Sequence, residues 1–214
     1  MKKIKMLAID LGASSGRGII GKFDGNKFTL EENHRFPSEP VTIAGSFNWD
    51  IMRIFHEIKQ AINKCALSDD RDIKTIGIDT WGVDYGLLDK NGHLAGVPRS
   101  YRLGVQADID AVLEKIPAEE LYSRTGIDTK LTFNTLYQLY RRKRENDAAL
   151  EIADTMLLTP DLLGYFLTGA AGTEYTIATT TGLYNPTTKD WDWQTIEELG
   201  LPKKIFTPID KTGT

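Results

Sequence analysis

The 214-residue sequence contains one cysteine and three histidines, too few for several kinds of functional site. A single thiol, Cys65, can form no disulfide within the chain, so we expect a reducing, cytoplasmic setting. Cys65 also ends an apolar helical pattern, which favours a core position over a role as nucleophile. The histidines, His34, His56 and His93, show no metal-ligand spacing and no Ser-His-Asp pattern. We therefore expect neither a histidine metal cluster nor a serine hydrolase.

Positive charge is also scarce, since 26 basic and 30 acidic residues leave a net charge of −4. The one basic run, residues 141–144, follows an apolar helical pattern and is typical of a solvated helix end. The N-terminal lysines, Lys2, Lys3 and Lys5, precede an apolar run that meets Asp10 almost at once. We expect neither a signal peptide nor a membrane span there. The sequence predicts no nucleic-acid partner and no membrane partner.

What the chain does have at its start is a series of β-rich segments. Residues 4–9, 16–23 and 27–36 predict three strands, and Asp24-Gly25-Asn26 supplies hairpin turn chemistry between the last two. A dinucleotide-binding βαβ fold would instead place a helix directly after the first strand. The pattern therefore predicts an antiparallel opening.

The rest of the chain alternates helical and extended patterns. Asn48 or Asp50 can cap a helix that runs to about Ala66, and a near-continuous apolar run predicts a strand at 73–78 that is buried on both faces. A strand follows at 85–89, and later segments are mostly helical: 107–115, 118–124, 135–145, 160–167 and 192–199, with a short strand at 156–158. This order is compatible with one three-layer α/β domain around a mixed sheet.

The first candidate site is the turn that follows the first strand. Small residues allow close approach of the backbone to a ligand, and consecutive N–H groups in a tight turn can bind an anion. Asp10 at the strand end can hold Mg²⁺ through water molecules. The predicted phosphate-binding residues are Ala13, Ser14, Ser15, Gly16 and Arg17. This is neither a Walker loop nor a GxGxxG motif, and the alternative is a plain hairpin with an exposed arginine.

The second candidate site is Asp79-Thr80-Trp81-Gly82-Val83-Asp84, at the end of the 73–78 strand. Ligands of open α/β sheets collect at such strand ends. Carboxylates and a hydroxyl can bind sugar hydroxyls, the indole offers an apolar face, and a glycine lets the ligand reach the backbone. In the alternative interpretation the segment only leaves the sheet, with Trp81 in the core, Asp84 as a turn cap and Gly82 supplying a positive φ.

These motifs resemble those of the FGGY family of carbohydrate kinases, and the resemblance covers essentially the whole chain. It rests on AIDLGASSGRG at 8–18, IGIDTWGVDYGLLD at 76–89, FNTLYQL at 133–139, LLTPDLLGYFLTG at 157–169 and EYTIATTTGLYN at 174–185. One departure lies after Tyr101-Arg102. Similar family members usually continue with an aspartate and an arginine, whereas Leu103, Gly104 and Val105 follow here.

The resemblance implies an actin-like, ribonuclease H-like domain of an enzyme that transfers phosphate from ATP to a sugar such as the deoxy-ketose L-rhamnulose. It implies that Asp10 helps to hold Mg²⁺ and that residues 13–17 meet the ATP phosphates. Gly82 would touch the ketose, with Thr80, Trp81, Asp84 and Asn134 nearby. Residues 1–214 would form the N-terminal, sugar-binding domain. The general base and the C-terminal, adenosine-binding domain of the same enzyme are expected beyond Thr214.

Three other functions stay open at this point. A kinase for the stereoisomer L-fuculose would use the same chemistry, and hydroxyl orientation cannot be read from the sequence. A non-catalytic sugar-binding protein could use half of the fold. An ATPase of the actin or heat-shock chaperone kind would share the nucleotide loop, but it needs no sugar pocket, and DTWGVD at 79–84 argues against it.

Overall fold

The computed structural model describes residues 3–213, and the chain divides into two compact units. The first unit contains residues up to 41 and residues 49–81, and the second contains residues 42–48 and those from 82 onward. Lys2 of the lysine-rich start and Thr214 of the tail lie outside the described residues.

The first unit is built on a four-stranded mixed sheet in the order β3-β2-β1-β6. Its strands are β1 (Ile4–Leu11), β2 (Ser15–Phe23), β3 (Phe28–Pro37) and β6 (Thr75–Thr80). The first three are antiparallel neighbours, and β6 runs parallel to β1. The predicted antiparallel opening is therefore confirmed, as is the mixed character of the sheet.

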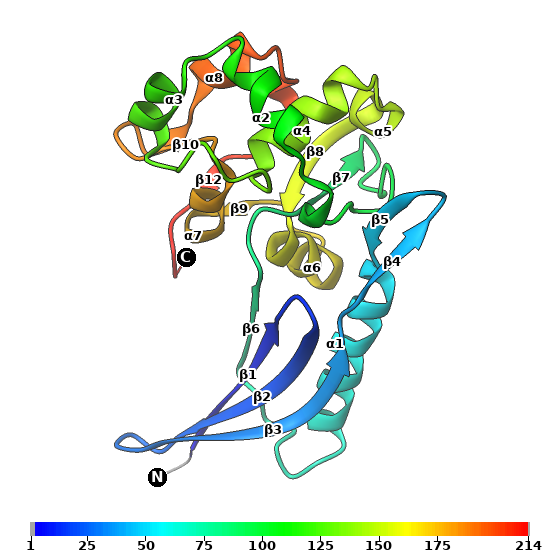
Figure 1. Cartoon of the computed structure of the whole chain (residues 1–214). Coiled ribbons are helices and arrows are strands. Elements are labelled where there is room, and N and C mark those ends of the chain that lie inside the picture. The colour runs from blue at the N-terminus through cyan, green and yellow to red at the C-terminus, as the bar shows by residue number, and fades with distance from the viewer. Residues whose placement is uncertain (1–2, 214) are drawn as a thin grey trace. The chain divides into compact units, whose positions relative to one another are not determined.

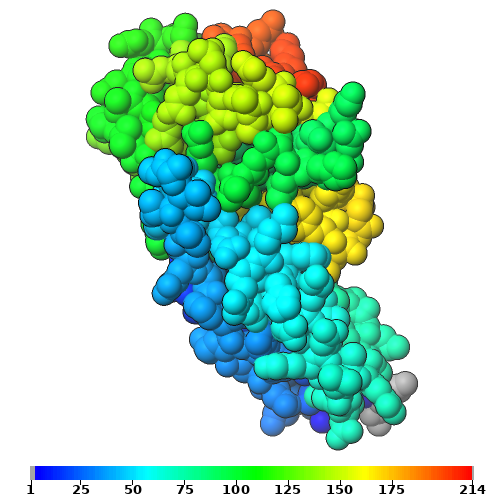
Figure 2. Space-filling view, turned by 90° about the vertical axis from the view of Figure 1, so that its right-hand side faces the viewer, coloured from blue at the N-terminus to red at the C-terminus, as the bar shows by residue number. Residues whose placement is uncertain are grey.

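Helix α1 (Ile51–Ala66) packs on this sheet (Figure 1). The helix begins after Asp50, whose side chain accepts a hydrogen bond from the Arg53 N–H at 3.1 Å, as an N-cap residue should. Its apolar face is buried against the inward-facing side chains of β1 and β2 (Leu7, Ile9, Leu11 and Ile20). Figure 2 views the unit from the helix side, with the cyan atoms of α1 in front of the blue strands. Cys65 is buried, as its apolar setting predicts.

The prediction that the 73–78 segment is buried on both faces is wrong. Strand β6 contains four exposed residues among its six, and the side chain of Ile76 is 44% exposed. The reason is its place at the edge of the sheet, where within the described residues it pairs only with β1. Apolar content alone does not reveal whether a strand lies at the centre or at the edge of a sheet.

The second unit combines an antiparallel strand pair with helices and short strands. The pair is β7 (Tyr85–Asp89) with β8 (Ala153–Leu158). The helices are α2 (Gln106–Leu113), α3 (Ala118–Thr125), α4 (Thr135–Arg144), α5 (Ala148–Ile152), α6 (Thr159–Thr168), α7 (Tyr175–Ala178) and α8 (Trp193–Glu198), with 3-10 turns η1 (Tyr101–Leu103), η2 (Thr179–Thr181) and η3 (Lys203–Ile205). The short strands within this unit are β9 (Thr173–Glu174), β10 (Tyr184–Asn185), β11 (Asp190–Trp191) and β12 (Ile209–Asp210). Strands β4 (Pro40–Ile43) and β5 (Ser46–Trp49) pair with each other, and only their residues 42–48 belong to the second unit.

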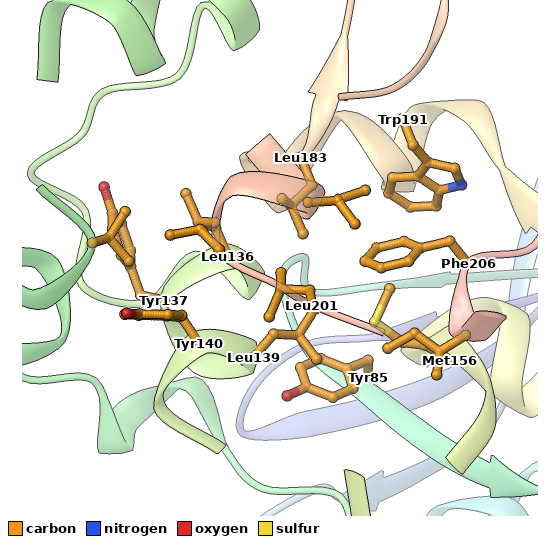
Figure 3. Packing of buried hydrophobic residues seen from close by; sticks show 14 of the residues in the cluster. Tyr85, Leu136, Tyr137, Leu139, Tyr140, Met156, Leu183, Trp191, Leu201 and Phe206 are labelled. Carbon is orange, nitrogen blue, oxygen red and sulfur yellow. The ribbon is translucent and has the colours of Figure 1, made fainter. Parts of the chain in front are cut away.

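A hydrophobic core holds the second unit together (Figure 3). Trp191 and Phe206 meet edge to face, with ring centroids 5.0 Å apart, beside Met156 of β8. The core also takes in side chains of β7 and α4, such as Tyr85 and Leu139. Because this core joins β7, β8 and α4, it fixes where the ends of these elements lie. Within the described part of the chain, no helix has the length and apolarity needed to cross a bilayer.

Candidate functional site

The turn between β1 and β2 is closed and supported from within the first unit. The N–H of Gly12 donates to the carbonyl of Ser15 at 2.9 Å. Buried Ser38 donates from its N–H to the Ser14 carbonyl at 3.2 Å and from its hydroxyl to the Gly12 carbonyl at 2.6 Å. Three carbonyl oxygens, which would repel a phosphate, are thus engaged by donors of the protein. Ser14 and Ser15 remain exposed, in keeping with the predicted role of the loop.

Gly16 differs from the other residues of the predicted phosphate loop because it is buried. A Cβ atom at this position would lie 2.5 Å from the ring of Phe36 and 2.7 Å from the side chain of Leu11. The glycine is therefore required for packing between β2 and its neighbours. The contact of Gly16 with phosphate stays a prediction, as do those of Ala13, Ser14, Ser15 and Arg17.

Charged side chains form a row across three neighbouring strands of the first unit. Arg17 of β2 donates from Nε to Oδ2 of Asp10 on β1 at 2.7 Å, and both side chains are partly exposed. In the parallel register, Asp79 of β6 lies directly beside Asp10 and therefore on the same face of the sheet. Mg²⁺ is usually bound through one or two carboxylates together with water and substrate phosphates. Two carboxylates on one face fit that ion, and Asp79 is a candidate that the sequence interpretation did not assign to it.

The end of β6 holds two further predicted residues within the first unit. The hydroxyl of Thr80 donates to the carbonyl of Trp81 at 2.7 Å. The indole of Trp81 stacks on that of Trp49, with ring centroids 3.9 Å apart and planes 30° apart. Trp49 is buried, so the stacking fixes the orientation of Trp81.

In the second unit the chain makes a tight turn immediately after entering it. The N–H of Asp84 donates to the Gly82 carbonyl at 2.9 Å, and Val83 between them has a φ of +68°. The positive φ therefore belongs to Val83, and the alternative in which Gly82 supplies it is wrong. A Cβ atom at Gly82 would instead lie 3.0 Å from Cγ2 of Thr180, so this glycine permits close approach of η2.

Asp84 and Asn134, both predicted near the sugar, are buried around this turn. The carboxylate of Asp84 accepts from Nε2 of Gln138 at 3.2 Å and from the N–H of Tyr101 at 3.2 Å. Asn134 precedes α4, and its Oδ1 is buried with no hydrogen-bond partner among the described residues. Buried polar groups in proteins are nearly always hydrogen-bonded, so this unpartnered amide oxygen can accept a hydrogen bond from a bound ligand. The roles of both residues stay predictions.

Three further side chains form hydrogen bonds with Val83 that sequence patterns alone do not reveal. Thr135 donates from Oγ1 to the Val83 carbonyl at 2.7 Å, Gln138 donates to the same oxygen at 3.2 Å, and Thr180 accepts from the Val83 N–H at 3.1 Å. The only sequence signal was that these residues lie in FNTLYQL and EYTIATTTGLYN, two of the segments on which the family resemblance rests. Their convergence on the backbone of one residue, Val83, requires the tertiary structure.

The comparisons with known proteins agree with this arrangement. Residues 5–214 match the family described as "FGGY family of carbohydrate kinases, N-terminal domain". The chain is 40% identical to a rhamnulokinase of Bacteroides thetaiotaomicron, with 99% of this chain and 44% of that protein covered. It is 43% identical to a rhamnulokinase of Oceanobacillus iheyensis, with 95% of this chain and 43% of that protein covered. The chain therefore spans less than half the length of these curated relatives.

Solved structures show the same fold at lower sequence identity. A ligand-bound xylulose kinase from Lactobacillus acidophilus superposes with a TM-score of 0.84 and 20% identity, over 98% of this chain and 42% of that one. A glycerol kinase from Plasmodium falciparum with ADP superposes with a TM-score of 0.75 and 16% identity, over 97% and 43%. The predicted α/β fold of the actin-like sugar kinases is confirmed.

Proposed function

The chain belongs to the FGGY family of carbohydrate kinases, and from that premise we propose that it is the N-terminal domain of an ATP-dependent kinase for L-rhamnulose. The reaction would convert ATP and L-rhamnulose into ADP and L-rhamnulose 1-phosphate. The observation that carries the proposal is the identity of 40–43% to three rhamnulokinases over 95–100% of this chain. The proposed partners are the sugar, ATP with Mg²⁺, and the C-terminal domain of the same enzyme, in the cytoplasm.

The loop at residues 12–17 is proposed to receive the ATP phosphates. The hydroxyls of Ser14 and Ser15 and the guanidinium of Arg17 are donors suited to phosphate oxygens. Arg17 already lies against Asp10, so both charges are held at the same point of the sheet. Preorganised donors at the transferring phosphoryl group stabilise the charge that develops there.

Asp10, with Asp79 beside it, is proposed to hold Mg²⁺. When bound, this ion supplies positive charge to the phosphates of ATP. Asp10 lies next to the loop that we assign to those phosphates, because it is the next-to-last residue of β1 and the loop begins after Leu11. The two carboxylates would hold the ion through its water molecules.

The turn at Gly82 is proposed to receive the ketose, with Thr80, Trp81, Asp84 and Asn134 nearby. The buried amide oxygen of Asn134 can accept a hydrogen bond from a sugar hydroxyl. Proton abstraction from the 1-hydroxyl is assigned to an aspartate in the portion of the enzyme beyond residue 214. Closure of the two domains around both ligands would bring these groups together.

A coupled ADP-release assay tests the proposal. For the enzyme that contains residues 1–214 together with its second half, we expect sugar-dependent turnover with L-rhamnulose on the order of 1–100 s⁻¹. L-Fuculose is the matched competitor, since it differs only in stereochemistry. A higher kcat/KM for L-fuculose than for L-rhamnulose would identify L-fuculose as the substrate. The absence of ADP release with either ketose would contradict the kinase assignment.

The same assay on residues 1–214 alone tests the division of labour between the two halves. Because the general base and the adenosine site are assigned elsewhere, we expect no sugar-dependent turnover from this chain. Turnover by the chain alone at an ordinary kinase rate would contradict that assignment.

A further inference from the structure

The backbone strain in the turn after β6 is concentrated at Val83. The φ of +68° at Val83, with the hydrogen bond from Asp84 N–H to the Gly82 carbonyl, describes a γ-turn. Such turns with a positive central φ are rare and strained, and a β-branched side chain raises the cost further. Among the residues that the structure describes, Val83 is the only β-branched one with a positive φ. A conformation of this kind persists only where its surroundings hold it in place.

Hydrogen bonds reach this strained peptide from two directions. On the carbonyl side, Thr135 Oγ1 and Gln138 Nε2 donate to the Val83 oxygen at 2.7 and 3.2 Å. On the amide side, the Val83 N–H donates to Thr180 Oγ1 at 3.1 Å. The carbonyl has two donors, whereas Thr180 is the acceptor on the amide side. Loss of the Thr180 hydroxyl should therefore affect the turn more than loss of either carbonyl partner alone.

The hydroxyl of Thr180 is oriented to accept a hydrogen bond from the Val83 N–H. It donates its single hydrogen to the carbonyl of Ile177 at 2.8 Å, which leaves its oxygen lone pairs for the Val83 N–H. Its neighbour Thr179 donates in the same way to the Thr176 carbonyl at 2.6 Å. No bond from Thr179 to the turn is present among the described residues. Thr179 is thus a matched control, because its hydroxyl makes the same bond within its own segment but none to the turn.

Thr180 also limits the space around Gly82. A Cβ atom at Gly82 would lie 3.0–3.1 Å from Cβ, Cγ2 and Oγ1 of Thr180. One side chain therefore lies close to two residues of the turn: its hydroxyl accepts from the Val83 N–H, and its atoms occupy the space beside Gly82. A change in the position of Thr180 would move the backbone against which the sugar is placed.

We propose that Thr180 is a positioning residue for the ketose, acting by holding the Gly82–Val83 backbone in the conformation that receives the sugar. The proposal rests on the assignment of the sugar to Gly82 in the proposed function. Thr180 need not contact the sugar itself. Its effect is on the fraction of molecules in which the turn is competent to bind, and a smaller fraction lowers the apparent affinity in proportion.

The test compares four forms of the enzyme that contains this chain and its second half: wild type, Thr180→Val, Thr180→Ser and Thr179→Val. Thr180→Val keeps the shape but removes the acceptor, and we expect the KM for L-rhamnulose to rise about fivefold to tenfold, the worth of one hydrogen bond. The KM for ATP should stay within about twofold. Thr180→Ser retains the acceptor and should restore the sugar KM to within about twofold of wild type.

The outcomes separate this inference from the function on which it rests. Equal sugar KM values for Thr180→Val and Thr179→Val would overturn the inference and leave the kinase assignment intact. No ketose-dependent turnover by the wild-type enzyme would contradict the proposed function and with it this inference. If the melting temperature shows that Thr180→Val does not fold, Thr180→Ala and Thr179→Ala take the places of the two valine variants. A sugar KM that is higher for Thr180→Ala than for Thr179→Ala supports the inference, and equal values overturn it.

Discussion

The loop at residues 12–17 and the turn at Val83 are both proposed to meet ligands, but they are built from residues at very different sequence separations. The loop joins two hairpin strands, and its ion pair links residues only seven positions apart. Its more distant support, from Ser38 to Gly12, spans 26 positions. The turn is held by side chains that are 52, 55 and 97 positions from Val83. The conformation of the loop thus follows from local sequence, and that of the turn depends on the folded core.

The largest effect is expected from the charged pair at the loop. Arg17→Ala and Asp10→Asn in the full-length enzyme should each lower kcat by about 10²–10³-fold, because charge changes at the transferring phosphoryl group in the transition state. The KM for the sugar should change little. Arg35→Ala is a matched control, since Arg35 lies opposite Arg17 on β3 and pairs with Glu32. Kinetics showing only a raised sugar KM for the Arg17 and Asp10 variants would contradict the assignment of the loop to ATP.

Substitution of Gly82 should affect the turn at Val83 and not the loop at residues 12–17. Gly82→Val places carbon atoms against Thr180 and so displaces the turn that we assign to the ketose. We therefore expect the sugar KM to rise about tenfold or more while ATP affinity is nearly unchanged. Some loss of stability is also expected, because Thr180 must shift. Melting temperature and both KM values should be measured together. A lower melting temperature with an unchanged sugar KM would mean that this turn is only structural.

A buried carboxyl predicts a pH dependence of stability in the second unit. The pKa of Asp161 is raised to about 7, chiefly by burial. A hydrogen bond from the Glu174 N–H opposes this rise, and the nearby charges of Glu174 and Asp210 contribute to it. The folded pKa exceeds the unfolded value, so the folded form binds the proton more tightly. The contribution of Asp161 to stability should therefore be largest at low pH and should fall as pH rises from about 4 to 7, by up to about 1.4 kcal/mol per pH unit.

The Asp161 prediction is checked by denaturant unfolding of the chain between pH 4 and pH 8. Asp161→Asn removes the titrating group and should flatten the slope across this range. Asp154→Asn serves as control, since Asp154 is an exposed carboxylate 3.7 Å from Lys204. A slope that is the same in the wild type and in Asp161→Asn would show that other groups cause the pH dependence.

The smallest effect is expected for Tyr85, which begins β7 two residues after Val83. Its hydroxyl is buried without a hydrogen-bond partner among the described residues, and burial raises its pKa. Tyr85→Phe removes this unpartnered group and should leave the free energy of unfolding unchanged or raise it by up to about 1 kcal/mol. Denaturant unfolding measures this difference. A loss of more than about 2 kcal/mol would show that the hydroxyl has a partner that stabilises the fold.

The sequence predicted most elements because their signals are local. The Asp24-Gly25-Asn26 turn, the cap at Asp50 and the periodic apolar face of α1 each act within a few residues. The exposure of β6 was not predicted, because it depends on which strand lies at the edge of the sheet. The short strands β9 to β12 were also missed, because two-residue pairs are fixed by distant partners rather than by their own pattern.

In the candidate site too, local contacts could be predicted from the sequence, whereas contacts between distant residues could not. Asp10 and Arg17 could be paired from the hairpin pattern, since opposite positions of neighbouring strands share a face. The position of Asp79 beside Asp10 required the parallel register, and the partners of Val83 required the packing of α4 and η2. In the structure Gly82 permits close approach of Thr180, which lies 98 positions later in the chain. The approach of a sugar to Gly82, which the sequence predicted, stays a prediction.

An amide-detected NMR titration of the chain with L-rhamnulose tests most directly whether the sugar binds at the Gly82–Val83 turn. The account predicts saturable shifts that are largest at the amides of Gly82, Val83 and Thr180, with the side-chain amide of Asn134 also affected. The amides of the 12–17 loop should move little without nucleotide. Saturable shifts centred elsewhere, with the Gly82–Val83 amides unmoved, would contradict the placement of the sugar at this turn.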